Sequence, residues 1–210
     1  MKTTWKFSAL ALFLAAGTAQ AQVWNETANG GGDAGELTGT AQVTALVSST
    51  LSSIVGTLSA GTDGDMYKIQ ICDFANFSAS LVGGASFDSQ LFLFSETGLG
   101  VLHNDDTGTP QSAIDNLGGQ ITANGQFFIA VTSYNRDPLT DAAQLIWNNT
   151  PFTGVRAPDG PGAGNNLSSW SGSSAAGVVP YTINFTGASY CGTAIPEEAQ
   201  TWGSLKATYR

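Results

Sequence analysis

The chain has 210 residues, of which 42% are hydrophobic and 11% are charged, and its formal net charge is −9. This length and hydrophobic content suffice for one sizeable core, while 26 glycines and few charged residues predict many turns and little helix. The acidic charge repels phosphate backbones, which excludes nucleic acid as an expected partner.

Residues 1–21 have the three regions of a secretory signal peptide. Lys2 and Lys6 precede a short apolar run, and Ala19-Gln20-Ala21 supplies the small residues of a cleavage site. The alternative, a membrane anchor, would need about 20 apolar residues, which neither this run nor any other stretch provides. We therefore expect a secreted or extracellular protein, free or associated with the cell surface, whose mature chain begins at Gln22 and has no transmembrane segment.

Apolar runs separated by turn residues predict an all-β fold. Residues 22–39, rich in Gly and Asn, are expected to be an extended lead-in outside the core. The predicted strands cover residues 40–46, 53–58, 65–71, 77–81, 91–94, 100–103, 126–134 and 181–185. Residues 65–71 alternate between apolar and polar, which indicates one buried face, whereas residues 91–94 are all apolar and indicate a central strand covered on both faces. The pattern predicts an antiparallel β-sandwich that forms one domain over residues 22–191.

Export changes how the two cysteines are interpreted, because an oxidising compartment permits a disulfide. Cys72 ends the predicted strand 65–71, and Cys191 follows the last apolar run. A Cys72–Cys191 disulfide would tie the closing strand to the centre of the sheet, and its long loop is worth about 4 to 5 kcal/mol on the chain-entropy model. Two free buried thiols are the alternative.

Residues 135–180 separate the last two core strands and form a segment far longer than the usual loop of about four to six residues. Aromatic side chains among Asn, Gly and Ser are typical of a ligand-binding surface. The candidate ligand-binding residues are Trp147, Phe152, Arg156 and Trp170. The alternative is packing, with residues 145–147 as an edge strand and Trp170 as a cap over an open end of the sandwich.

Carboxylates and amides gather at three predicted turns. They are Asp63 and Asp65, then Asp88, then Asn104, Asp105 and Asp106. Calcium takes six to eight oxygen ligands, and neighbouring loops that bring these side chains together could supply several of them. Asp and Asn also form turns by bonding the local backbone, so purely structural turns are the alternative. Calcium is the only cofactor that the sequence suggests.

The sequence offers few parts for an enzyme. His103 is the only histidine, and neither a G-x-S-x-G elbow nor an H-E-x-x-H helix is present. We therefore expect a non-catalytic protein. A hydrolase that acts on glycosides through two carboxylates is the remaining exception.

Five ordered motifs over residues 26–191 resemble bacterial pre-peptidase C-terminal-like modules of secreted proteins. They are NETANGGGDAGEL near the start, G-x-L followed by D-x-D-x-Y at 56–67, FDSQLFLF at 87–94, GVLHNDD at 100–106 and NGQFFIAVTSYNRDP at 124–138. The IWNNTPF and APDGPG stretches resemble a subset of these modules that often has a C-terminal sorting signal. The resemblance implies a jelly-roll-like β-sandwich without catalysis of its own. Relatives attached to secreted peptidases serve in substrate binding or support, and some collagen-binding relatives hold calcium.

The C-terminal tail, residues 192–210, departs from that sorting pattern. Residues 195–198 resemble the opening of the signal, but no hydrophobic span follows. Apolar and aromatic residues at helix-like spacing after Thr201 predict a short helix. The tail is either a docking or sorting tag or a frayed end.

Two functions remain besides the enzyme exception. The favoured one is an extracellular module that binds a polymer or a surface protein, and the alternative is a structural component of the cell surface or matrix. Replacing Trp147 or Trp170 should lower the affinity of a binder for its ligand, whereas in a structural protein it should lower only stability or assembly.

Overall fold

The computed structural model describes residues 22–45, 50–174 and 176–191. The predicted signal peptide and the predicted tail helix lie outside these ranges. Within them, no helix is both long and apolar enough to cross a membrane. The described chain is mostly β-structure, arranged in two main mixed sheets.

The first sheet contains β1 (Gln22–Asn25), β3 (Leu51–Leu58), β5 (Ser78–Ser80), β8 (Ala113–Asp115) and β12 (Val179–Thr186). The second contains β2 (Gln42–Val43), β4 (Gly64–Ile71), β6 (Ser89–Ser95), β7 (Gly100–Asn104), β9 (Gly125–Ser133) and β13 (Ala188–Ser189). A small ribbon pairs β10 (Pro138–Leu139) with β11 (Ser169–Trp170), and the helical elements are α1 (Glu26–Gly30) and a 3-10 turn (Phe74–Asn76). The strand order is β1-β3-β12-β5-β8 in the first sheet and β13-β4-β9-β6-β7 in the second, with β2 beside β4.

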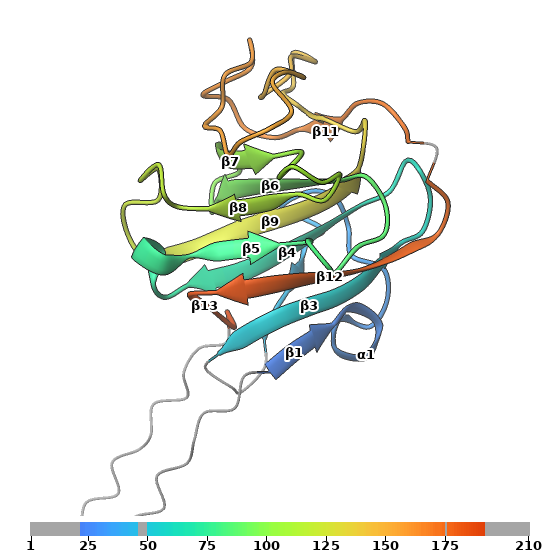
Figure 1. The fold of residues 1–210 in the computed structure, drawn as a ribbon, viewed down its shortest axis with the longest axis vertical. Helices are drawn as coiled ribbons and strands as arrows, with labels where there is room; N and C mark the ends of the chain where they lie inside the picture. The colour runs from blue at the N-terminus through green and yellow to red at the C-terminus, as the bar shows by residue number, and fades with distance from the viewer. Residues whose placement is uncertain (1–21, 46–49, 175, 192–210) are drawn as a thin grey trace, which may run out of the picture.

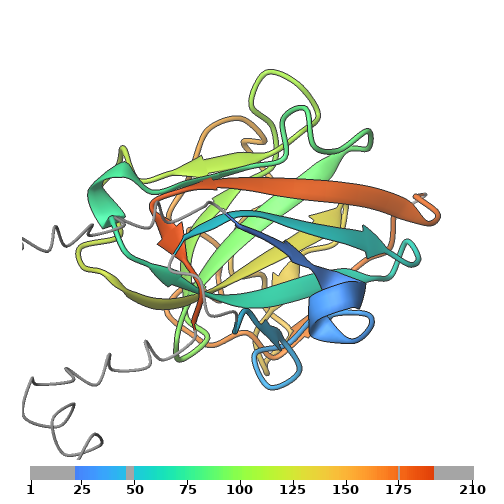
Figure 2. The same cartoon turned by 90° about the horizontal axis from the view of Figure 1, so that it is seen from below.

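The main hydrophobic core lies between the two sheets, which Figures 1 and 2 show as stacked layers. From the second sheet, Tyr67, Ile69 and Ile71 of β4 enter this core, which confirms the predicted alternation. From the first sheet, Ile54 of β3 and Ile183 of β12 enter the same core. Each fully buried side chain of this size stabilises the fold by about 1.5–3 kcal/mol, so the facing sheets hold each other in place.

A second hydrophobic cluster covers the other face of the second sheet. In β6, Leu91 and Leu93 belong to the main core, while Phe92 and Phe94 belong to the second cluster. This confirms the prediction of a central strand that is covered on both faces. The cover comes from the long segment between β10 and β12, whose gold and orange loops gather beyond β7 at the top of Figure 1.

The N-terminal segment is part of the fold, so the prediction of an extended lead-in was wrong. Strand β1 pairs with β3, and Trp24 is buried in the main core. The side chain of Asn25 caps α1 by accepting a hydrogen bond from the N–H of Ala28 at 2.8 Å. Gly31 ends the helix at φ 85°, a left-handed conformation that favours glycine. A four-residue strand and a single helical turn are too short to leave a periodic pattern in the sequence.

The sequence predicted purely antiparallel sheets, but both main sheets are mixed. Strand β1 runs parallel to β3, and β2 runs parallel to β4. The pairs β3/β12, β4/β9 and β6/β9 are antiparallel. Residues 145–147 form no edge strand, because Leu145 makes only an isolated bridge to Leu139.

The two cysteines are free, so the predicted disulfide was wrong. Cys72 directly follows β4, whereas the N–H of Cys191 donates to the carbonyl oxygen of Thr44, whose own N–H donates to the carbonyl oxygen of Lys68 on β4. Four residues of strand separate Lys68 from Cys72, about 13 Å, whereas a disulfide needs Cα atoms within about 7 Å of each other. The sequence indicated that both cysteines lie near strand ends, but it did not show where along β4 the C-terminal segment lies.

Candidate functional site

The six predicted calcium ligands do not converge on one site. Asp65 of β4 lies opposite Val131 of β9. Val131 lies opposite Leu91 of β6, which in turn lies opposite Asn104 of β7. Asp65 and Asn104 therefore share one row of the second sheet, but they are three strand spacings apart, about 14 Å. The predicted carboxylates divide into two clusters along this row.

The Asp65 cluster consists of Glu26, Asp33 and Asp65, whose carboxylate oxygens lie within 4.8 Å of one another. Glu26 is buried and fixed in place, because its two oxygens accept hydrogen bonds from the N–H groups of Ala34 and Thr57, both at 2.9 Å. Asp33 is exposed and connects the cluster to solvent. Asp65 is fully buried, and its Oδ1 has no hydrogen-bond partner in the described part of the chain. Such an oxygen is costly unless a proton or a cation neutralises it.

A pair of hydrogen-bonded tyrosines, one from each sheet, adjoins Asp65. The hydroxyl of Tyr181, on β12, donates to Asp65 Oδ2 at 2.5 Å, and the hydroxyl of Tyr67 lies 2.6 Å from that of Tyr181. Burial raises the pKa of Asp65 to about 9; the Tyr181 hydrogen bond opposes this rise, and the neighbouring carboxylates add to it. Without a cation, Asp65 is therefore protonated at neutral pH. A divalent cation would allow it to ionise.

The Asp105 cluster consists of Asp88, Asp105 and Asp106, again with carboxylate oxygens within 4.8 Å of one another. Asp88 precedes β6 and is exposed, whereas Asp105 follows β7 and is only 3% exposed. Asp105 Oδ1 finds no hydrogen-bond partner among the residues that the structure describes. Burial raises the pKa of Asp105 to about 7, the charges of Asp106 and Asp88 add to the rise, and Arg156 opposes it. Both clusters thus combine one buried, unpartnered carboxylate with at least one exposed one.

The remaining two predicted ligands bond the local backbone. Asp63 accepts a hydrogen bond from the N–H of Ser59. Asn104 is buried, accepts from the N–H of Ala113 at 2.8 Å and donates through Nδ2 to the carbonyl oxygen of Asp106 at 2.9 Å. These contacts are the ones expected of turn-forming residues.

Both clusters offer oxygen ligands of the kind that hard cations prefer, so they could hold a metal such as calcium. Sequence reasoning missed Glu26 and Asp33, because they lie in the segment that was interpreted as a lead-in. One local signal could have identified Glu26, since it follows the N-cap residue Asn25 in the first turn of a helix. Its proximity to Asp65 could not be found that way, because it depends on how the N-terminal segment docks against β4.

The two tryptophans of the candidate ligand-binding set pack against the second sheet. Trp147 is 2% exposed, and its ring centroid lies 5.6 Å from that of Phe92 and 5.7 Å from that of Phe94. Trp170 is half-buried on the same cluster, and its Nε1 donates to the carbonyl oxygen of Glu36 at 2.8 Å. Both indoles thus contribute to the second hydrophobic cluster, the arrangement expected of packing residues.

Phe152, by contrast, is 38% exposed, and its backbone bonds that of Asp106 in the Asp105 cluster. Its ring meets that of Tyr134 edge-on, with 5.9 Å between centroids. The carbonyl oxygen of Phe152 accepts a hydrogen bond from the N–H of Asp106 at 3.1 Å, and the N–H of Tyr134 donates to the carbonyl oxygen of Asp88 at 2.9 Å. The backbone therefore attaches both aromatic residues directly to the carboxylate cluster.

Arg156 holds the long loop together. Its guanidinium donates to the carboxylate of Asp159 at 2.6 Å and to the carbonyl oxygens of Asn148 and Thr150 at 2.8 and 3.3 Å. The charge is thus paired within the loop. These contacts give Arg156 a structural role in the segment that carries Phe152.

His103 is buried against the second hydrophobic cluster, where its ring contacts Phe92 and Trp147. Its ring stacks on Phe92, with 4.4 Å between centroids, and Nδ1 lies 3.1 Å from the carbonyl oxygen of Leu91. Burial lowers the pKa of His103 to about 3, and the charge of Arg156 lowers it further. The imidazole is therefore neutral and enclosed at physiological pH, an environment suited to packing rather than to proton transfer.

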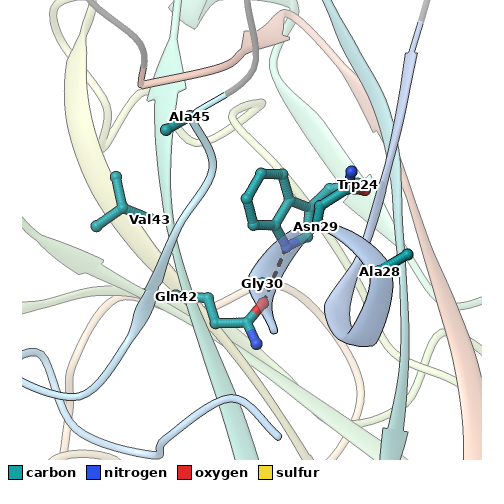
Figure 3. A pocket seen from close by; sticks show the side chains of 7 residues that line it. All are labelled: Trp24, Ala28, Asn29, Gly30, Gln42, Val43 and Ala45. Atoms are coloured by element: carbon teal, nitrogen blue, oxygen red, sulfur yellow. Dashed lines mark hydrogen bonds between the residues drawn. The ribbon is translucent and has the colours of Figure 1, made fainter. Parts of the chain in front are cut away.

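An open pocket of about 380 Å³ lies beside α1 and β2 (Figure 3). Trp24 and Gln42 line it, and the indole Nε1 donates to Gln42 Oε1 at 2.9 Å. Its lining contains no charged side chain and none of the predicted site residues. The pocket therefore offers amide and indole contacts, but not the carboxylates that a metal would require.

No protein-family model matches the chain, and neither a curated protein nor a solved structure matches it. The resemblance to pre-peptidase C-terminal-like modules therefore stays a prediction from motifs.

Proposed function

We propose that the chain is a secreted, non-catalytic module with a jelly-roll-like β-sandwich fold that binds an extracellular polymer or surface protein and holds calcium at its two carboxylate clusters. The shared core of the facing sheets supports the sandwich, and the three-part leader supports export. The motif resemblance supports a binding role. The enclosed, neutral His103 supports a protein without histidine-based catalysis.

The single observation that carries this proposal is the buried Asp65 carboxyl with its unpartnered Oδ1. Ionised carboxylates within 4.8 Å repel one another, and burial increases the cost of their charge. A divalent cation removes both penalties, with Asp65 and Asp33 as ligands and with Glu26 held at a fixed position by its two backbone donors. The ion would join α1 and the following turn to β4.

Calcium suits these clusters better than magnesium does. The ligands come from a helix start, turns and strand ends, which provide irregular oxygen geometry. Calcium accepts such geometry at six to eight ligands, whereas magnesium demands a near-octahedral arrangement and gives up its waters reluctantly.

Thermal melting in chelator and in millimolar calcium tests the calcium part of this proposal. A ligand that binds only the folded state at about 100 times its dissociation constant adds about 2.7 kcal/mol, which is enough to raise the midpoint by several degrees. Magnesium should raise it less. Equal midpoints in chelator and calcium would contradict the proposal.

Two variants make the melting test specific. Asp33→Asn removes an exposed ligand of the Asp65 cluster, so it should reduce the calcium-induced shift. Asp141→Asn makes the same change of charge at an exposed residue outside both clusters and should leave the shift unchanged. An equal loss of shift in both variants would indicate a general charge effect instead of a site.

The packing of Trp147 and Trp170 favours a second candidate, a structural component of the cell surface or matrix, because it leaves little of either indole on the surface. A glycan and matrix-protein binding screen of the purified mature chain separates the two candidates. Saturable binding to one class supports the module proposal, and assembly without any such binding supports the structural alternative.

A further inference from the structure

The Asp105 cluster and the ring pair of Phe152 and Tyr134 adjoin each other on the surface. Hydrogen bonds from the backbone of Asp106 and to the backbone of Asp88 connect the two, and Phe152 is 38% exposed. Of the candidate ligand-binding residues in the long loop, Trp147 is buried, whereas Phe152 is partly exposed and forms a small aromatic surface with Tyr134.

A calcium ion in the Asp105 cluster would keep open coordination positions. Each of the three carboxylates offers one oxygen, and calcium takes six to eight. Asn104 does not complete the shell, because its side chain already bonds the backbone of Ala113 and Asp106. About three to five positions are therefore left for water or for an outside ligand.

The charge at this cluster selects against anionic ligands. Three carboxylates outweigh one calcium ion, and Asp137 adds a further nearby acid whose charge raises the pKa of Asp105. Arg156 is paired with Asp159 at 2.6 Å, and the whole chain carries a formal charge of −9. An acidic peptide or an anionic polysaccharide would be repelled, whereas hydroxyl groups supply oxygen ligands without charge.

We propose that calcium in the Asp105 cluster and the ring of Phe152 together bind a neutral saccharide through two adjacent hydroxyl groups. The inference rests on the proposed calcium binding and names the class of polymer that the module recognises. The two hydroxyl oxygens complete the calcium shell, while the apolar face of the sugar packs on Phe152, which Tyr134 supports from its edge. The buried Asp105 anchors the ion, while the exposed Asp88 and the half-buried Asp106 lie on the side that a ligand can reach.

Native affinity electrophoresis of the mature chain, residues 22–210, in gels containing soluble mannan, dextran or arabinogalactan tests this inference. At least one of these neutral polymers should retard the chain in calcium, and EDTA should abolish the retardation. Asp88→Asn should abolish it as well. Phe152→Ala should weaken the affinity at least about tenfold, equivalent to about 1.4 kcal/mol. As a matched control, Val23→Ala shortens a 48% exposed apolar side chain on β1 and should change nothing.

Calorimetric calcium titration of the same preparations separates the two ways of failing. If calcium binds but no neutral polymer retards the chain, the saccharide inference is wrong and the calcium sites stand. If Asp88→Asn leaves the calcium titration unchanged, the Asp105 cluster is not a calcium site and the proposed function fails there. Retardation that persists in EDTA, or that only polygalacturonate or an acidic peptide produces, would also overturn the inference.

Discussion

Replacing Trp147 with alanine should strongly destabilise the protein, because the indole is the centre of the cluster that fixes the long loop. The ring contacts Phe92, Phe94 and His103, with centroid distances of 5.6, 5.7 and 5.6 Å. Those partners lie on β6 and β7, whose ladder limits how far they can collapse into a cavity. Truncation of such a ring costs about 3–5 kcal/mol, which for a chain of this size lowers the midpoint by roughly 6 to 20 °C.

Thermal melting in calcium, followed by circular dichroism, measures this effect. Trp147→Phe should fall between the wild type and the alanine variant, because it keeps part of the ring. Leu117→Ala is the control, since truncating a side chain that is 91% exposed should cost only about 0.5 kcal/mol. A Trp147→Ala protein that melts like the wild type would show that the indole does not hold the loop, and the reasoning on the second cluster would be refuted.

Further predictions concern packing, pH and thiols. Gly100→Ala should cost about 1–3 kcal/mol in denaturant unfolding, because a Cβ there would lie 2.6 Å from Trp147 Cη2, whereas Gly39→Ala, with open space, should be near neutral. In chelator, stability should fall between pH 7 and 9 by up to about 1.4 kcal/mol per unit, since folded Asp65, with its pKa raised to about 9, retains a proton that the unfolded chain has lost. The stabilisation that comes from the Asp65 proton is complete below about pH 4 and is lost as the pH rises through 9. Asp65→Asn should flatten the slope of stability against pH, and an unchanged slope would show that Asp65 is not the group that titrates. Both cysteine thiols should be alkylated in denaturant without reductant, and a linked peptide pair in a mass map would contradict the structure.

The parts of the fold that sequence could predict are those in which burial leaves a local pattern. Strand β4 alternates because one side faces the main core, and β6 is apolar throughout because the long loop covers its other side. Strand β1 and helix α1 left no such pattern. Their positions, and the parallel pairing at the sheet edges, depend on contacts between segments far apart in the chain.

The carboxylates of the candidate site were predictable as residues but not as groups. Asp65 and Asn104 stand out at strand ends, yet only the strand order shows that they lie about 14 Å apart in one row. The same order gives Asp65 its partners Glu26 and Asp33 from a segment with no strand pattern. The disulfide prediction was wrong for a related reason, because neither strand's own sequence specifies the register of β13 against β4.

The number of calcium ions that each chain binds tests the central claim most directly. Isothermal titration should find two ions per wild-type chain, one in Asp33→Asn, one in Asp88→Asn and none when both changes are combined, because each change removes an exposed ligand from a different cluster. Asp141→Asn should retain two. A wild-type chain that binds no calcium, or a stoichiometry that neither variant changes, would contradict the account.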